Sequence, residues 1–417
     1  MNPGLAIKLR PTGPWRIGPD SGARNSVDVI YHSDSLYSAV ASAMARFGLL
    51  DDWLNATART GAPAVCFSSC FPFVDEIGYV VPPRTIWPPR SPGALSARVR
   101  WKSARFVPLG IVQAMLTGQV LDENHWAVDG VSECLVPAGR SGPFRTGVRW
   151  NAAVDRLSGA TERHSTACME FRPGGGLWTI VAFADEAARD RWLDPIKSAF
   201  RLLADSGFGG ERSRGWGRSE APEFIEGSLP GMILGNAEAT PVTDADEQKP
   251  ESVPPVETPS PVETSAGEAA AAAPATEPDE PLSGAAVEAV LAASAGSEET
   301  RADEVPPEPA PAAAARTATP EPGSLTAHWL LSLFTPAPAD AVDWGRGNYS
   351  VVVRSGRVES PSGSGELKKQ LHMVTEGSVL YAENALRGSA PDVAPDGFAH
   401  PVFRAGFALS IPLPEVS

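Results

Sequence analysis

The chain has 417 residues, of which 35 are Lys or Arg and 50 are Asp or Glu, giving a formal net charge of -15. No apolar run approaches the ~18 to 20 residues that a membrane-spanning helix needs, and residues 1–11 lack the apolar core of a secretory signal. The four cysteines are scattered and none forms a C-x-x-C pair, which favours buried free thiols over a disulfide framework or a metal site. These features predict a cytoplasmic protein without a membrane partner.

One internal segment carries the net charge. Residues 238–323 contain 18 acidic and 3 basic residues, which leaves 32 of each sign in the rest of the chain. The segment is rich in Pro, Ala and Glu and has no aromatic residue, so it cannot bury enough apolar area to offset the entropy cost of ordering. We therefore expect a disordered acidic tether over 238–323 between folded parts at 1–237 and 324–417. Its acidity does not argue against a nucleic-acid ligand, because clusters of basic residues in the folded parts decide that question.

The start of the first folded part predicts a strand and a helix. Residues Leu5–Arg10 alternate between apolar and polar, which is typical of a strand. The apolar spacing over His32–Gly48 predicts a helix, with Ser33 as its N-cap and Gly48 as its stop. The apolar run Val65–Val74 predicts a buried strand.

A β-α-β unit closes the first folded part. Thr179–Ala184 is typical of a strand, and Asp185–Ala204 has the apolar stripe of an amphipathic helix. A glycine-rich loop follows, and then a second strand near Glu220–Ile225. Two such units fit a ferredoxin-like α+β domain. The part after the tether is mostly strand-like, and the pattern does not locate its helices.

The strongest functional signal is the segment Gly207–Arg218, which holds five glycines, three arginines and a tryptophan. Glycine permits positive φ and close backbone approach, and consecutive amide groups can then form an anion-binding nest. The guanidinium of an arginine can bind two phosphate oxygens at once, and an indole can stack on a base. The candidate RNA-binding residues are Gly207, Gly209, Gly210, Arg212, Ser213, Arg214, Gly215, Trp216 and Arg218. The alternative is a glycine-rich hairpin whose arginines are merely solvated.

A second candidate RNA-binding region is Arg140–Arg163. Its arginines, including Arg145, Arg149 and Arg156, stand among turn residues and alternate with aromatic residues. Arginine combined with aromatic side chains suits single-stranded RNA, which proteins hold by phosphate contacts and stacking. Solvated strand faces are the alternative reading.

The third constellation is His32–Ser33–Asp34 at the start of the predicted helix. Adjacent residues of these types do not form a catalytic triad, because their side chains point apart. The N–H groups at the helix start and the Ser33 hydroxyl could instead receive a phosphate, which makes His32 and Ser33 candidate RNA-binding residues. Capping of the helix alone is the other possibility.

Several passages resemble a known protein family. Leu5–Pro11, Tyr31–Val40, Gly207–Arg218 and Asp343–Phe407 are similar to the fourth subunit of the Csm (type III-A CRISPR) interference complex, of the RAMP superfamily. The glycine-rich loop marks only the superfamily. The HSDSLYSAV helix and the C-terminal passages, which include WGRGNY and GELKKQLHMVTEGS, are more specific to this subunit. The resemblance covers essentially all of the chain except the tether.

The resemblance implies two ferredoxin-like (RRM-like) domains, over 1–237 and 324–417, with a β-hairpin thumb for which Arg140–Arg163 is the candidate. It also implies a non-catalytic subunit that binds the 5′ handle of the crRNA and contacts the large polymerase-cyclase subunit and the backbone RAMP subunits. No catalytic residue, cofactor or metal ligand is predicted. The competing hypothesis is a metal-independent endoribonuclease that processes CRISPR repeat RNA, as in a sister family, with His32 as its base.

Overall fold

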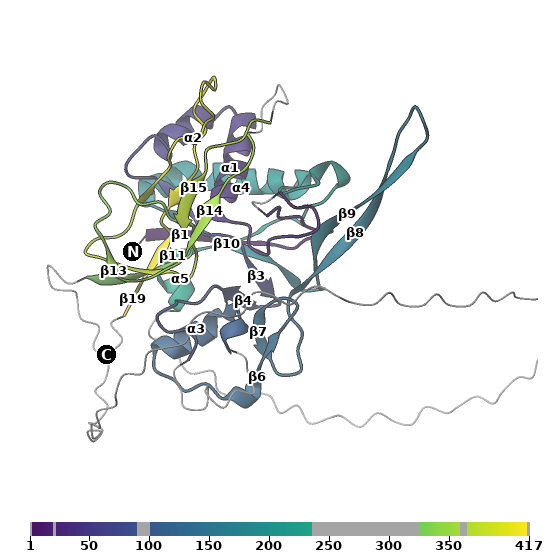
Figure 1. Ribbon diagram of the computed structural model, residues 1–417. Coiled ribbons are helices and arrows are strands. Elements are labelled where there is room, and N and C mark those ends of the chain that lie inside the picture. Colours follow the sequence, from purple (N-terminus) through teal and green to yellow (C-terminus); the bar gives the residue numbers. More distant parts are fainter. Residues whose placement is uncertain (1, 20–21, 90–100, 236–324, 359–364, 415–417) are drawn as a thin grey trace, which may run out of the picture. The chain divides into compact units, whose positions relative to one another are not determined.

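The computed structural model describes residues 2–19, 22–89, 101–235, 325–358 and 365–414. The described residues on both sides of the predicted tether belong to one compact unit (Figure 1). The tether itself, over 238–323, lies outside the described residues. The division of the folded part into two domains stays a prediction.

The largest sheet within the described ranges has seven strands. Its spatial order is β11 (Glu223–Leu229), β1 (Asn2–Leu9), β10 (Gly175–Phe183), β3 (Phe71–Val74), β4 (Ile77–Val80) and β5 (Val107–Pro108), and β2 (Val65–Phe67) also pairs with β10. Strand β1 is antiparallel to both of its neighbours. Its alternating residues Leu5, Ile7 and Leu9 are fully buried, which confirms the strand predicted there.

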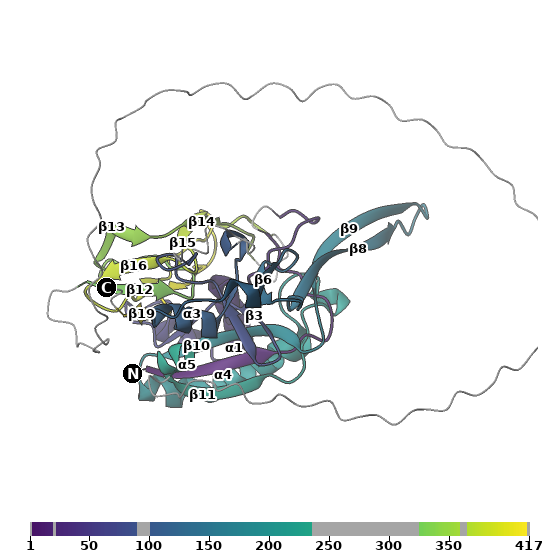
Figure 2. The same ribbon diagram turned by 90° about the horizontal axis from the view of Figure 1, so that it is seen from below.

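Two long helices pack side by side against this sheet. They are α1 (Ser33–Arg46) and α4 (Glu186–Ser206), and α2 (Leu50–Ala56) packs on α1 (Figure 2). Helix α4 starts as predicted, because the side chain of its N-cap Asp185 accepts a hydrogen bond from the N–H of Ala188. The remaining described helices are α3 (Leu109–Leu116) and α5 (Gly231–Leu234), with 3-10 turns η2 (Trp101–Ser103), η3 (Glu123–His125) and η4 (Arg212–Arg214). None of the helices in these ranges is long and apolar enough to cross a membrane.

The run Val65–Val74 is not the single strand that its apolar pattern predicts. It divides into β2 and β3, because Ser68 and Ser69 form other hydrogen bonds. The Ser68 hydroxyl accepts from the N–H of Ile180, and the Ser69 N–H donates to the carbonyl of Leu331. The interruption ties the first sheet to the C-terminal part of the chain.

The described C-terminal residues form strands and loops. A four-stranded sheet has the order β13 (Val342–Asn348), β16 (Val379–Ala382), β12 (Thr326–Leu330) and β19 (Ser410–Leu413). Two antiparallel pairs lie beside it, β14 (Val351–Arg354) with β15 (Leu371–Val374) and β17 (Gly388–Ser389) with β18 (Gly406–Phe407). The inward residues Trp329, Leu331 and Ile411 join the core that contains β1.

A long antiparallel hairpin leaves the unit just before the start of β10. It consists of β8 (Phe144–Val154) and β9 (Thr161–Phe171), and both ribbon views show it projecting away from the sheets (Figures 1 and 2). A shorter pair, β6 (Trp126–Asp129) and β7 (Cys134–Pro137), lies nearby. The hairpin falls where the sequence places its second arginine-rich region.

Candidate nucleic-acid interface

The glycine-rich loop after α4 is packed against the segment that precedes α1. The N–H of Gly210 donates to the carbonyl of Arg16 at 2.8 Å, and the N–H of Gly217 donates to that of Pro14 at 3.0 Å. The glycine backbone permits this packing. At Gly217, where φ is +78°, an added Cβ would clash with the carbonyl oxygen of Phe208. These glycines are therefore required for close approach of the backbone.

Several of the loop amides that the sequence assigns to an anion-binding nest are used for packing within the protein. The N–H groups of Gly207, Gly210, Gly215 and Gly217 donate to carbonyl oxygens of the protein. The exposed side chains here are those of Arg212, Ser213, Arg214 and Arg218.

The stacking role expected of Trp216 is wrong for this structure. Only 9% of the residue is exposed, so no indole face is open to a base. Nearby, Phe208 packs edge-on against Trp15, with ring centroids 4.6 Å apart. The aromatic residues of the loop thus stabilise its docking on the core, because a buried ring contributes mostly through the apolar area that it removes from water.

The glycine-rich loop and the hairpin meet at Arg214. One guanidinium nitrogen lies 3.0 Å from a carboxylate oxygen of Glu211, and the other donates to Nε2 of His164 on β9 at 3.3 Å. The two regions that the sequence singles out separately therefore adjoin in space.

The hairpin has two chemically different faces because side chains alternate along its strands. One face of β8 carries Arg145 and Arg149, which both bind the carboxylate of Glu170 on β9. Hydrogen bonding from Arg145 lowers the pKa of Glu170, so this carboxylate is ionised at neutral pH. The other face carries Trp150, which is 66% exposed and has the guanidinium of Arg163 5.2 Å from its ring centroid.

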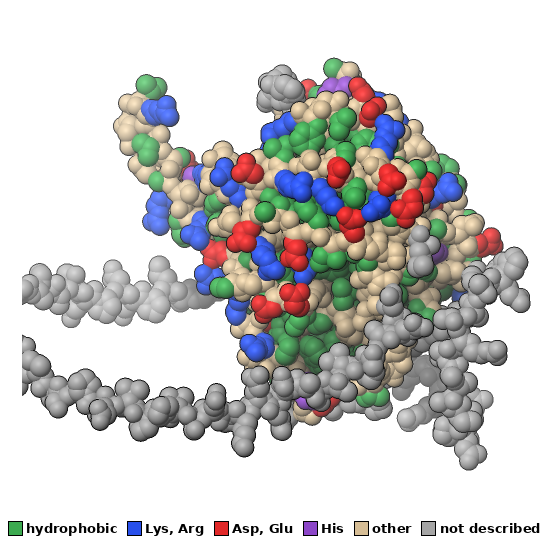
Figure 3. All heavy atoms as spheres, turned by 180° about the vertical axis from the view of Figure 1, so that it is seen from behind, with side chains coloured by type: hydrophobic (Ala, Val, Ile, Leu, Met, Phe, Trp, Pro, Cys, Tyr) green, Lys and Arg blue, Asp and Glu red, His purple; other side chains and the backbone are tan. Residues whose placement is uncertain are grey.

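Arg156 lies in the exposed turn at the end of the hairpin. Figure 3 shows basic side chains at the tip of the projecting hairpin and toward its base. The face of α4 and β11 is different, since acidic and basic side chains alternate there. On that face Glu226 binds both Arg189 and Lys197.

Arg16 is a residue that the sequence analysis missed. Its buried guanidinium donates to the carbonyls of Ala23 and Ala167, each at 2.9 Å, while its own carbonyl receives the glycine-loop N–H described above. Burial lowers the pKa of Arg16. This one side chain fastens the loop, the turn before α1 and the base of β9 together. No local pattern distinguishes it from a surface arginine.

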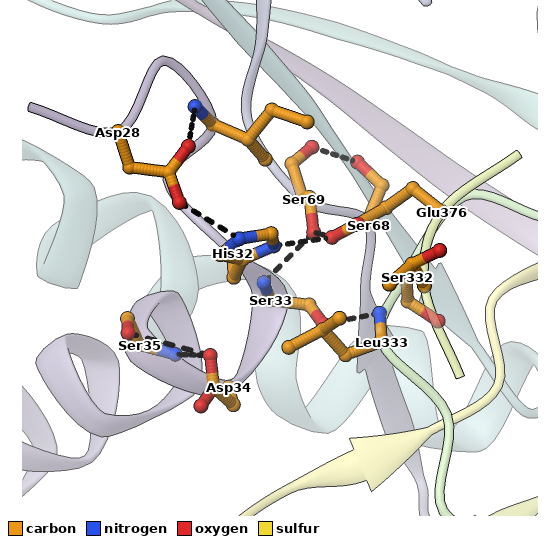
Figure 4. Close-up of polar contacts among 12 residues, drawn as sticks. Asp28, His32, Ser33, Asp34, Ser35, Ser68, Ser69, Ser332, Leu333 and Glu376 are labelled. Carbon is orange, nitrogen blue, oxygen red and sulfur yellow. Dashed lines mark hydrogen bonds and ion pairs between the residues drawn. The ribbon is translucent and has the colours of Figure 1, made fainter. Parts of the chain in front are cut away.

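The His32–Ser33 turn is buried, which contradicts the predicted contact with RNA (Figure 4). His32 is the N-cap of α1 but caps through its backbone, and Ser33 is the first helical residue rather than the N-cap. The Ser33 hydroxyl accepts from the N–H of Leu333 at 3.0 Å. The N-terminus of this helix therefore faces the C-terminal part of the chain and not solvent.

Both ring nitrogens of His32 contact carboxylates. Nδ1 lies 2.7 Å from Oε1 of Glu376, and Nε2 lies 3.2 Å from Oδ2 of Asp28. Burial disfavours the imidazolium, but the Glu376 charge and the two hydrogen bonds outweigh it and raise the pKa of His32 to about 10. The ring is therefore protonated at neutral pH. A protonated ring whose two nitrogens both contact carboxylates lacks the free lone pair that a general base uses to accept a proton.

Asp34 anchors a second buried cluster. Its carboxylate pairs with Arg354 at 3.0 Å and also binds Arg404, and all three residues are buried. Burial would raise the pKa of Asp34, but the two guanidinium groups lower it to about 2. The residues from His32 to Asp34 thus hold α1 to the C-terminal strands. The partners Arg354, Glu376 and Arg404 lie so far along the chain that no sequence spacing could have revealed them.

Comparison with known proteins identifies the C-terminal part. Residues 325–413 match the family model described as the CRISPR Csm4 C-terminal domain. The resemblance to the fourth Csm subunit is confirmed. No curated protein sequence matches the chain.

A solved structure of a Csm4 complex has a similar fold. A chain of the Csm3–Csm4 subcomplex in the type III-A CRISPR-Cas interference complex is 12% identical, with a TM-score of 0.51, over 99% of this chain and 100% of that chain. A chain of a Csm1–Csm4 cassette in complex with cA4 is 13% identical, with a TM-score of 0.48, over 100% of this chain and 99% of that one. At 12% identity, the likeness to the chain of the Csm3–Csm4 subcomplex concerns the mixed α+β fold alone.

Proposed function

We propose that this chain is the Csm4 subunit of a type III-A CRISPR interference complex and binds the 5′ handle of the crRNA without catalysing a reaction. The observation that carries the proposal is the match of residues 325–413 to the Csm4 C-terminal domain. The solved relatives are described as assemblies of Csm4 with Csm1 or with Csm3. By analogy, the large polymerase-cyclase subunit and the backbone RAMP subunits are the expected protein partners.

The strand orders support two ferredoxin-like folds. In a β-α-β-β-α-β unit the fourth strand pairs with the first, and the third lies between the first and the second. The first sheet has this order in β11, β1, β10 and β2 or β3, with α1 and α4 at the two helix positions. The C-terminal sheet repeats it in β19, β12, β16 and β13, with strands and loops in place of the helices.

The handle RNA would lie along the surface where the glycine-rich loop adjoins the hairpin. Arg212, Arg214 and Arg218 are exposed on the loop, and Arg145, Arg149 and Arg156 are exposed on the hairpin. Phosphate contacts from such arginines can hold a single strand. In place of the buried Trp216, the exposed Trp150 is the stacking residue that we propose for this surface.

The proposed mechanism is positional. A loop fixed by Arg16 and by backbone hydrogen bonds presents its arginines in one geometry, so little conformational entropy is lost when RNA binds. The handle would then hold one register, with the guide extending toward the backbone subunits. The burial and protonation of His32 support this role over the competing nuclease, because that hypothesis needs a neutral, accessible base.

A filter-binding titration with RNA that carries the repeat-derived 5′ handle tests the proposal. We expect the double variant Arg212→Ala, Arg214→Ala to weaken binding at least tenfold. Its slope of log affinity against log salt should fall by about 0.7 for each phosphate that the variant no longer neutralises. The control is Arg59→Ala, Arg191→Ala, which removes two exposed arginines that pair with Asp51 and Asp52 near α2.

Three results would contradict the proposal. Equal affinity of the double variant and the control would mean that the loop does not contact RNA. Cleavage of the RNA that disappears in His32→Ala would favour the nuclease. Failure of the isolated wild-type chain to bind handle RNA at any salt concentration would favour a protein that only assembles other subunits.

A further inference from the structure

Strand β14 carries an exposed apolar stripe at the edge of the C-terminal part. Tyr349, Val351 and Val353 occupy alternate positions, so they share one face, and they are 39%, 52% and 40% exposed. Trp344 extends the stripe, since its ring meets that of Tyr349 with centroids 5.2 Å apart. Figure 2 shows β13, β14 and β15 on the side of the unit away from α4 and β11.

The backbone of β14 is also open on one side. Among the described residues, β14 pairs only with β15. The N–H of Thr375 donates to the carbonyl of Ser350, which makes these two a hydrogen-bonded pair. Because such pairs alternate along an antiparallel ladder, the N–H and C=O groups of Val351 and Val353 point away from β15. An unpaired edge of this kind is a template for another strand.

The edge strand of the first sheet shows how such an edge is normally protected. Strand β11 lies at the end of its sheet, but it carries Glu223 and Glu226, and Glu226 binds Arg189 and Lys197. Charged side chains on an edge discourage pairing with another chain. Strand β14 consists of three valines followed by Arg354, whose side chain is buried against Asp34, so its exposed residues include no proline and no charge. The contrast points to a strand that is kept open for a partner.

We propose that the edge of β14 docks an extended, apolar segment of a neighbouring protein subunit, which pairs with it as an additional strand. The proposal rests on the proposed function, because it needs neighbours in a complex. Backbone hydrogen bonds would provide affinity, and the stripe of Tyr349, Val351 and Val353 would receive alternate side chains of the partner. Aromatic side chains such as Trp344 are typical of the residues that contribute most to protein interfaces.

The charges around the stripe define the partner further. Arg84 and Arg346 lie at its Tyr349 end, since Arg84 donates to Ser350 and Arg346 stacks 4.8 Å from the ring centroid of Tyr381. At the other end, the exposed His372 lies opposite Val353. A segment with acidic residues at the end that lies near Tyr349 would complement the two guanidinium groups.

RNA fits this surface less well than a protein segment does. Valine side chains offer neither a stacking surface nor a hydrogen bond to a base. Trp344 and Tyr349 offer ring faces, but the open N–H and C=O groups of β14 match the backbone of another strand rather than a base.

Binding measurements with purified subunits test the proposal. The full-length chain is immobilised, and the dissociation constants of the large polymerase-cyclase subunit, the backbone RAMP subunit and handle RNA are measured by biolayer interferometry. Val351→Glu with Val353→Glu should weaken the binding of one of the two protein subunits at least 100-fold and leave the affinity for RNA unchanged. Val351→Thr with Val353→Thr keeps the shape and the strand propensity of the side chains and should weaken the binding of the same subunit about tenfold. If circular dichroism shows that the Glu variant is misfolded, the Thr variant tests the proposal in its place.

The matched control is Ile225→Thr, an exposed aliphatic residue on the protected edge strand β11. Unchanged affinity for both protein subunits in the folded stripe variants would overturn the proposal. Loss of RNA binding alone would assign the stripe to RNA, and a wild-type dimer that dissociates in the variants would assign it to a second copy of this chain. If the wild-type chain binds neither subunit nor RNA, the proposed function fails, whereas normal wild-type binding with unaffected variants removes only the inference about β14.

Discussion

His32 and Glu376 are 344 positions apart in the chain, yet the imidazole Nδ1 lies 2.7 Å from the carboxylate. The Glu376 carboxylate also accepts from the hydroxyl of Ser69. Both the carboxylate and the ring are removed from water, so the pair is stabilising only while both partners are present. This ion pair joins the first helix to the C-terminal strands across the whole of the predicted tether.

Removing the Glu376 charge should destabilise the fold. In Glu376→Gln the side chain keeps its shape, but the buried imidazolium of His32 loses its closest counter-charge. We expect a loss of about 3 kcal/mol in the free energy of unfolding, typical of breaking a buried ion pair. Chemical denaturation followed by tryptophan fluorescence measures it. The control Glu366→Gln removes an exposed carboxylate and should change stability by less than about 0.5 kcal/mol. Equal effects of the two variants would show that the buried pair contributes nothing.

The same ion pairs predict how stability depends on pH. His32 has a folded pKa near 10 against 6.5 when unfolded, so its contribution is complete below pH 6.5 and is lost as the pH rises toward 10. Asp34 has a folded pKa near 2 against 3.8, so its contribution is complete above pH 4 and is lost as the pH falls toward 2. Stability from these groups is therefore greatest between about pH 4 and 6.5.

Unfolding free energies of the wild type and of His32→Gln, measured from pH 5 to 9, isolate the histidine. The wild type should lose stability above pH 6.5 with an extra slope of at most about 1.4 kcal/mol per pH unit, and the variant should lack that slope. Parallel curves for the two proteins would mean that His32 does not titrate with folding.

Local patterns predicted those elements whose structure is determined locally. The helix α1 and the capped start of α4 follow from apolar spacing and from one N-cap residue, because a helix satisfies its hydrogen bonds within itself. The arginine-rich hairpin was also singled out, because arginines stand among turn and aromatic residues over 140–163. The mixed α+β fold follows from the order of these elements.

Roles that depend on distant partners could not be read from the sequence. His32 and Ser33 have the residue types of a phosphate-binding helix start, but Glu376 and Leu333 bury them. Trp216 has the setting of a stacking residue, but only 9% of it is exposed. For His32 and Ser33 the deciding partners lie in a segment that no spacing rule connects to the motif.

The charge of Glu170 should lower the affinity of the hairpin for RNA. It binds both Arg145 and Arg149, which are proposed phosphate ligands. In Glu170→Gln the two guanidinium groups lose their shared counter-charge and become better partners for phosphate. We expect handle RNA affinity to rise several-fold at low salt, with a salt slope steeper by about 0.7 for each additional phosphate that is neutralised. The control Glu162→Gln changes the formal charge equally on the exposed part of β9. An equal increase in RNA affinity in both variants would mean that only the net charge of the protein matters.

Substitutions at two glycines of the loop distinguish the cost of backbone strain from the cost of losing close packing. Gly215 and Gly217 have nearly the same φ, +79° and +78°, but an added Cβ meets no atom within 4 Å at Gly215 and meets the carbonyl oxygen of Phe208 at Gly217. Gly215→Ala should therefore lose only about 1 kcal/mol, the cost of a left-handed conformation. Gly217→Ala must also move the backbone at 217 away from that of Phe208, so its unfolding free energy should fall by about 3 kcal/mol or more. The affinity of Gly217→Ala for handle RNA should also fall, because the arginines of η4 lose their fixed positions. Equal losses of stability in the two variants would show that close packing of the loop is unimportant.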